Sequence, residues 1–232
     1  MRNRFNKCLV ISSIFTLTMG SSFAQTEDQV TDFISAAKFD DVSGVKKLLA
    51  AGVSPNTKDP KGNPMLIVAI RDQSNKVADL LLADKAIDVN LPNKNDETPL
   101  MMASLDNNLP LVKKLVLSSK AAINRTGWTP LHYSTTAGNV EITEFLLNQG
   151  AMINARSPNN TTPLMMAVFN GNEIVIKLLL DKGADLKMRN DQGYTAIDVA
   201  TSYNKQDIQQ GLQSRWQKVY KAAYPGGPKI SP

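Results

Sequence analysis

Cysteine and histidine are nearly absent from this chain of 232 residues, which holds one of each, Cys8 and His132. One cysteine cannot form an intramolecular disulfide, and one histidine cannot complete a His/Cys metal site or a Cys–His catalytic pair. Asp96 and Glu97 are adjacent carboxylates, but their spacing does not indicate the separated acid and base that general acid–base catalysis needs. The sequence therefore predicts no enzyme activity, no metal site and no cofactor.

Aromatic residues are also scarce, at 6 % of the chain, so the core is expected to be aliphatic and rich in methionine. The formal net charge is +5, but three of the basic residues lie within the first 24 positions. The remainder carries 23 basic and 21 acidic residues, interspersed along the sequence. This balance lacks the concentrated positive charge that binds a phosphate backbone, so no nucleic-acid partner is expected.

The first 24 residues have the pattern of a secretory signal peptide. A basic start precedes an apolar stretch from Leu9 to Met19, and small residues then place a cleavage site between Ala24 and Gln25. The stretch is shorter than the roughly 20 apolar residues that span a membrane. We therefore expect a chain that is exported to the periplasm or secreted, without stable membrane insertion. An uncleaved N-terminal anchor is the alternative.

Similar hexapeptides recur along the chain at a nearly constant period. TPLMMA (98–103), TPLHYS (129–134), TPLMMA (162–167) and TAIDVA (195–200) begin 31, 33 and 33 residues apart, and PMLIVA (64–69) is a weaker copy. A threonine can cap a helix whose first residue is proline, so each Thr-Pro pair indicates a helix start. A second apolar stretch follows each copy and indicates a second helix. Glycines such as Gly150 and Gly183 are typical of the end of the second helix. Short helix pairs bury their apolar faces only by stacking, so the period predicts a solenoid.

The stretch Trp128-Thr129-Pro130-Leu131-His132, with Gly138-Asn139-Val140-Glu141 behind it, closely resembles the ankyrin-repeat family. The resemblance extends over residues 28–212. It implies an all-α solenoid of stacked helix-turn-helix units with short β-turn fingers. It also implies a concave face, formed by the fingers and first helices, that binds a partner. The residues expected to hold the repeats together are Thr98, Thr129, Pro130, His132, Gly150, Thr162, Pro163 and Gly183.

The predicted organisation begins with the signal peptide (1–24) and an N-terminal capping repeat (25–58). Four ankyrin repeats follow (59–92, 93–123, 124–156 and 157–189), then a C-terminal capping repeat (190–213) and a C-terminal helix with a disordered tail (214–232). In the second unit, Asn63 is expected to cap a helix that begins at Pro64. The finger from Asn124 to Thr129 is about three residues shorter than its counterpart before Thr162.

Trp216, Tyr220 and Tyr224 have the spacing of one helical stripe. The prediction is an added helix packed on the last repeat, and the alternative is a docking helix for a partner or a membrane surface.

Seven residues are candidates for partner contact. Trp128 and Tyr194 each precede a repeat threonine, near the base of a finger, and large aromatic side chains are enriched among binding hot spots. Leu105 and Phe169 occupy first-helix positions that usually face the groove in this family. Arg71, Arg125 and Arg156 are candidates for the rim. The alternative for these side chains is that they only shield their own turns.

The function that the resemblance implies is protein binding by a monomer. Similarity to exported bacterial ankyrin proteins favours an inhibitor or immunity protein, or an accessory protein, for a periplasmic partner. The alternative is an envelope scaffold with several weakly bound partners.

Overall fold

The computed structural model describes residues 25–228, and in this range the chain forms twelve α-helices, one π-helical turn and no β-strand. The helices form six consecutive pairs. These are α1 (Glu27–Lys38) with α2 (Val42–Ala50), α3 (Met65–Arg71) with α4 (Asn75–Ala83), α5 (Pro99–Leu105) with α6 (Leu109–Lys113) and the π turn η1 (Lys114–Ser118), α7 (Pro130–Ala137) with α8 (Val140–Asn148), α9 (Pro163–Asn170) with α10 (Glu173–Asp181), and α11 (Ala196–Ser202) with α12 (Gln206–Tyr220). The prediction of an all-α ankyrin-type solenoid is confirmed.

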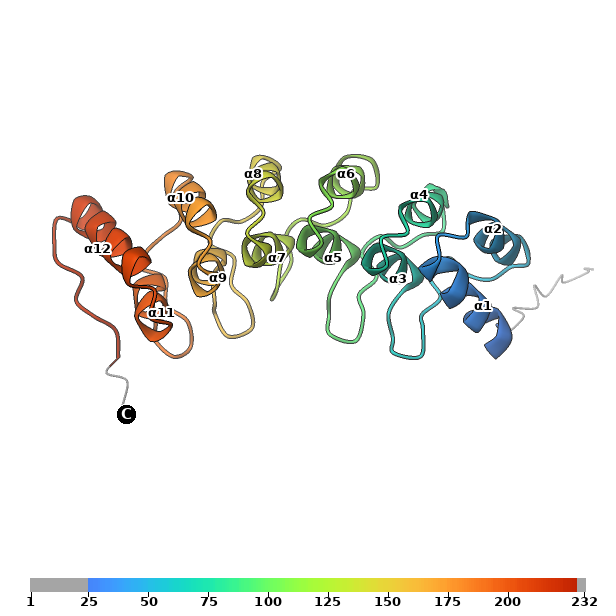
Figure 1. Cartoon of the computed structure of the whole chain (residues 1–232), viewed down its shortest axis with the longest axis horizontal. Coiled ribbons are helices and arrows are strands. Elements are labelled where there is room, and N and C mark those ends of the chain that lie inside the picture. Colours follow the sequence, from blue (N-terminus) through green and yellow to red (C-terminus); the bar gives the residue numbers. More distant parts are fainter. Residues whose placement is uncertain (1–24, 229–232) are drawn as a thin grey trace, which may run out of the picture.

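The helix pairs stand side by side in a curved row (Figure 1). The first helices of the pairs line the inner side of the curve, and the second helices form the outer layer. The loops between successive pairs project as fingers beyond the first helices. Fingers and first helices together therefore form one continuous concave face.

The helix starts follow from the recurring Thr-Pro pairs. Pro99, Pro130 and Pro163 each occupy the first turn of a helix, where a missing N–H removes no helical hydrogen bond. The hydroxyl oxygen of Thr98 accepts the amide N–H of Met101 at 3.4 Å, and Thr162 accepts that of Met165 at 3.3 Å. These bonds satisfy amide groups that have no partner inside the helix.

The expected start of the second unit is wrong by one residue. Pro64 itself is the N-cap of α3, the helix begins at Met65, and no side chain caps it. The Asn63 carboxamide is bound inside the fingers, because it donates to Asp59 Oδ2 at 3.0 Å and accepts from Asn93 Nδ2 at 3.3 Å. It therefore joins two neighbouring fingers and does not cap the helix.

An extra residue in the third repeat is accommodated by the π turn. Asn108 and Ala121 are 13 positions apart, whereas the equivalent pairs Asn139–Ala151 and Asn172–Ala184 are 12 apart. A π turn closes its hydrogen bonds over one more residue than an α-helix does. The insertion is thus absorbed in η1, and the register of the following repeat is preserved.

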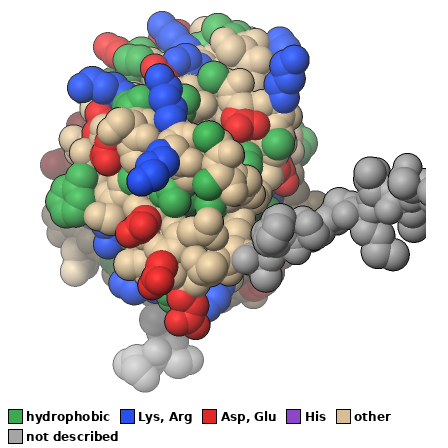
Figure 2. All heavy atoms as spheres, turned by 90° about the vertical axis from the view of Figure 1, so that its right-hand side faces the viewer, with side chains coloured by type: hydrophobic (Ala, Val, Ile, Leu, Met, Phe, Trp, Pro, Cys, Tyr) green, Lys and Arg blue, Asp and Glu red, His purple; other side chains and the backbone are tan. Residues whose placement is uncertain are grey.

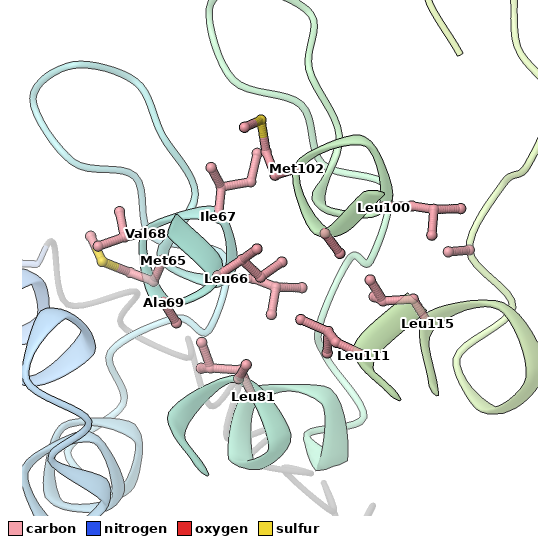
Figure 3. Packing of buried hydrophobic residues seen from close by; sticks show 14 of the residues in the cluster. Met65, Leu66, Ile67, Val68, Ala69, Leu81, Leu100, Met102, Leu111 and Leu115 are labelled. Carbon is pink, nitrogen blue, oxygen red and sulfur yellow. The ribbon is translucent and has the colours of Figure 1, made fainter. Parts of the chain in front are cut away.

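The core is aliphatic and runs along the stack between the two helix layers. Figure 3 shows Leu66, Leu81, Leu111 and Leu115 converging from neighbouring helices of the second and third repeats. Buried side chains form one cluster up to Ala151 and a second from Leu164 to Trp216. Polar side chains are buried near the boundary between them, namely His132, Ser134, Thr135 and Thr143.

The C-terminal helix differs from the expected separate helix, and the tail expected to be disordered after Pro228 lies outside the described residues. α12 runs without a break from the last repeat through Trp216 to Tyr220, and Lys221 ends it in a left-handed conformation with φ of 56°. Tyr224 lies beyond the helix, so the three aromatic residues do not form one helical stripe. The chain turns back, and the Tyr224 hydroxyl contacts Thr195 Oγ1 at 2.7 Å and the Asp198 carboxylate.

Residues 222–228, which we call the returning segment, cover the end of the stack. The Trp216 ring lies 4.5 Å from that of Tyr220 and 4.9 Å from that of Tyr224, measured between centroids. Pro228 packs against Gly193 in the last finger. Figure 2 looks at the opposite, N-terminal end, where acidic and basic side chains are scattered among small apolar areas. The signal-peptide prediction concerns residues outside the described range.

Candidate partner-binding face

Equivalent positions on the first helices give the concave face its side chains. One such position, four residues after the His132 position, is partly or fully exposed in five repeats and is occupied by Arg71, Leu105, Thr136, Phe169 and Ser202. Leu105 is 37 % exposed and Phe169 is 42 % exposed. These are the two apolar candidates that the sequence placed on this face.

Phe169 belongs to a hollow between the last two repeats, which we call the α9–α11 hollow. Its volume is about 570 Å³. The lining residues are Asn159, Thr161, Met165, Met166, Phe169, Asn190, Gln192, Tyr194, Val199, Ser202 and Tyr203. Two sequence candidates, Phe169 and Tyr194, therefore lie in one site, although they are 25 residues apart in the chain.

Tyr203 was not among the sequence candidates. It follows α11 directly and is 53 % exposed. Its ring meets that of Phe169 edge to face, with centroids 4.5 Å apart and an angle of 85° between the planes. The sequence shows an aromatic residue at a helix end, but only the stacking of two repeats brings it against Phe169.

Trp128 lies elsewhere, at the base of the short third finger, which Figure 1 shows as the shallow loop before α7. The indole is partly buried and its ring centroid lies 5.2 Å from that of His132, nearly perpendicular to it. Trp128 thus shields the buried imidazole as well as bordering the concave face.

His132 is fully buried and joins the fourth repeat to the fifth. Its Nδ1 accepts the Thr129 N–H at 3.2 Å, which leaves Nε2 to donate to the Thr161 carbonyl oxygen at 3.0 Å. Burial lowers the pKa of His132 from its ordinary 6.5 to about 4, against the smaller opposing effect of the Thr161 and Ala155 carbonyls. The imidazole is therefore neutral at pH 7 and forms a hydrogen bond between repeats.

The three arginine candidates have different surroundings. Arg125 holds both carboxylate oxygens of Asp96 at 2.7 Å and so links two adjacent fingers. Arg156 donates to Asn160 Oδ1 at 3.0 Å within its own finger. Arg71 is exposed. Burial of Asp106 raises the pKa of that carboxyl, and the positive charge of Arg71 partly offsets the increase. Arg125 is therefore primarily a finger contact, whereas Arg71 and Arg156 remain candidates for the rim.

Tyr133 is a second side chain that the sequence analysis missed. It is half-buried near the middle of the face, and its hydroxyl donates to Glu97 Oε1 at 2.9 Å. Burial raises the pKa of Tyr133, and the neighbouring Glu97 adds to this effect. The available signal was its alignment with Met102 and Met166, which marks a position on the inner side of the first helices.

No group of three or more His, Cys, Asp or Glu side chains in residues 25–228 is arranged to hold a metal ion. No helix in the same range is both long and apolar enough to cross a membrane.

Comparisons with known proteins agree with the repeat architecture. The family model for ankyrin repeats (3 copies) matches residues 33–126, 80–157, 106–190 and 153–219. Ankyrin repeat and SAM domain-containing protein 6 of Rattus norvegicus is 36 % identical over 114 residues, which are 47 % of this chain and 13 % of that protein. Transient receptor potential cation channel subfamily A member 1 of Homo sapiens is 31 % identical over 119 residues, covering 50 % of this chain and 10 % of the channel. The chain thus spans only a small part of these relatives.

A solved structure extends the likeness to three dimensions. It is the Bd0816 predatory endopeptidase from Bdellovibrio bacteriovorus in complex with immunity protein Bd3460. One of its chains superposes with a TM-score of 0.69 and 26 % identity, covering 79 % of this chain and 97 % of that one. The family matches together extend over residues 33–219, and the chain belongs to the ankyrin-repeat family.

Proposed function

We propose that this ankyrin-repeat protein is exported to the periplasm and binds one protein there through its concave face, as an immunity or accessory protein. Ankyrin repeats are protein-interaction modules, which supports the general part of the proposal. The similar fold of an immunity protein in complex with an endopeptidase supports the specific part. In this proposal the concave face acts by binding alone and contributes no catalytic residue.

The exposed aromatic pair in the α9–α11 hollow is the observation that carries the proposal. Phe169 and Tyr203 keep about half of their surfaces open while fixed against each other. Rigid aromatic side chains bury a large area at little cost in conformational entropy, which makes them common anchors in protein interfaces.

Replacement of the concave aromatic residues is expected to weaken partner binding. Phe169→Ala and Tyr194→Ala should each cost about 2 kcal/mol or more, roughly thirtyfold in Kd, because each removes an anchor from the hollow. Trp128→Ala should weaken binding and also lower the melting temperature, because the indole covers His132. The measurement is calorimetric titration of each variant with the partner captured from the periplasm, alongside thermal melts.

The matched control is Lys177→Ala on the outer helix α10, where the Lys177 ammonium forms an ion pair with Asp181 of the same helix at 2.6 Å. This variant should bind as the wild type does. Unchanged affinity of all three aromatic variants would rule out the concave face as the binding site. Weak, salt-sensitive binding to several proteins would favour a scaffold over an immunity protein.

Export predicts a processed N-terminus. The pattern of residues 1–24 places cleavage after Ala24, so the exported protein should begin at Gln25. Mass spectrometry of the protein in the soluble periplasmic fraction measures this directly. Recovery of intact Met1 in that fraction would contradict cleavage, and retention of all the protein in the cytoplasm would contradict export.

A further inference from the structure

We propose that the α9–α11 hollow binds an uncharged loop of the partner protein and takes one apolar or aromatic side chain of that loop against Phe169 and Tyr203. This inference rests on the proposed function and specifies which part of the partner the concave face recognises. It is carried by the charge, the hydrogen-bonding state and the aromatic geometry of the hollow.

The lining of the hollow contains no charged side chain. Its polar members are all neutral, namely Asn159, Thr161, Asn190, Gln192 and Ser202. Charged residues make up 20 % of the chain, and a second hollow at the N-terminal end of the same face is lined by several of them, namely Lys38, Asp59, Lys61, Arg71 and Asp72. An ionised side chain entering the α9–α11 hollow would lose hydration without gaining a counter-ion, which is costly. The electrostatics therefore select a neutral segment.

The fingers beside the hollow are already ordered. The side-chain oxygen of Asn190 accepts the backbone N–H groups of Gln192 at 3.1 Å and of Tyr194 at 2.9 Å. The Asp191 N–H donates to the Asn159 carbonyl oxygen at 3.1 Å, which ties the two fingers together. Binding therefore does not have to order these loops, and little conformational entropy is lost.

Hydrogen-bond donors remain available in the same two fingers. The side-chain NH₂ groups of Asn159, Asn190 and Gln192 donate no hydrogen bond to any residue in the range 25–228. Carboxamide donors match the carbonyl oxygens of a peptide backbone. The hollow thus combines an apolar surface for a side chain with neutral donors for the main chain beside it, as an inserted loop requires.

The test uses isotope-labelled protein produced from the full-length chain and three blocked pentapeptides. Each peptide has glycine and serine around a central residue, which is tryptophan, glutamate or lysine. In NMR titrations, the tryptophan peptide is expected to shift the backbone amide signals of Phe169, Tyr194 and Tyr203, with saturation at millimolar concentration. The glutamate and lysine peptides should leave these signals in place at the same concentrations.

Phe169→Ala is expected to weaken binding of the tryptophan peptide roughly tenfold or more, because one side of the aromatic site is lost. The matched control is Ile174→Ala, which removes an exposed apolar side chain from the outer helix α10 and should leave the titration unchanged. The inference is overturned if a charged peptide shifts the same signals equally. It is also overturned if the tryptophan peptide shifts none of them, or if it binds elsewhere on the protein.

A separate measurement distinguishes this inference from the proposed function. If the double variant Phe169→Ala/Tyr203→Ala retains full affinity for the partner while Trp128→Ala loses it, the concave face binds but the hollow does not. If every concave variant keeps full affinity, the proposed function itself fails.

Discussion

Replacement of Trp216 by alanine is expected to lower the free energy of unfolding by about 3 kcal/mol, near the lower end of the range for buried aromatic residues. The indole is only 6 % exposed and packs between the rings of Tyr220 and Tyr224. Its Nε1–H is buried and has no hydrogen-bond partner in the described residues, so its removal offsets part of the loss of apolar packing. Urea denaturation followed by circular dichroism measures the change.

The end of a repeat stack contacts only one neighbour, so the last unit is expected to unfold first in this variant. Hydrogen exchange should therefore accelerate in α11 and α12 before it does in α7. Trp216→Phe keeps most of the apolar contact and should change stability by less than about 1 kcal/mol. Val219→Ala, at a side chain 53 % exposed on the same helix, should have little effect. A Trp216→Ala protein as stable as the Val219→Ala protein would show that the returning segment does not cap the stack.

Acidification is expected to destabilise the protein by up to about 3 kcal/mol through His132 alone, because its pKa falls from 6.5 to about 4 on folding. Between these two values the unfolded chain binds a proton at this residue that the folded protein excludes. Stability therefore rises with pH across this window. The contribution is fully present above pH 6.5 and is lost as the pH falls toward 4. Denaturation midpoints at a series of pH values measure the slope.

Carboxylates also titrate in part of this range, so the comparison needs a variant without the imidazole. His132→Met is the matched choice, because Met101 and Met165 occupy the equivalent buried positions. At pH 7 the variant should be less stable by about 1 kcal/mol, because it loses the hydrogen bond to the Thr161 carbonyl. The difference should shrink and then reverse as the pH approaches 4. Parallel pH profiles for the two proteins would show that His132 does not carry this dependence.

The sequence was most informative where one residue type settles a local conformation. A Thr-Pro pair followed by apolar residues at helical spacing gave correct helix starts at Pro99, Pro130 and Pro163. Gly150 and Gly183 do adopt positive φ angles just after α8 and α10. Where the pair was incomplete, at Asn63-Pro64, the expected cap was wrong, because Asn63 forms hydrogen bonds with a neighbouring finger that the local sequence does not reveal.

The candidate site could be predicted only in part. Phe169 and Tyr194 were chosen from their positions within a repeat, and the structure places both in one hollow. Tyr203 and the neutral character of the lining depend on how the fifth and sixth repeats stack. Arg125 was predicted to lie at the rim because it is charged. In the structure it instead pairs with Asp96 of the adjacent finger. Contacts between side chains about 30 residues apart are not visible in the pattern of one repeat.

By itself, the sequence determined the period, the family and the order of helices, because these follow from caps, turns and apolar spacing within about 33 residues. Tertiary structure alone decided three further features. The inserted residue in the third repeat became a π turn, and a layer of buried polar side chains came to lie between two apolar clusters. In addition, Tyr224 turned back to cover the last repeat, where it contacts Asp198 at the position that His132 occupies in the fourth. Each of these features depends on which surface the neighbouring repeat presents, and in a solenoid that surface exists only after the units have stacked.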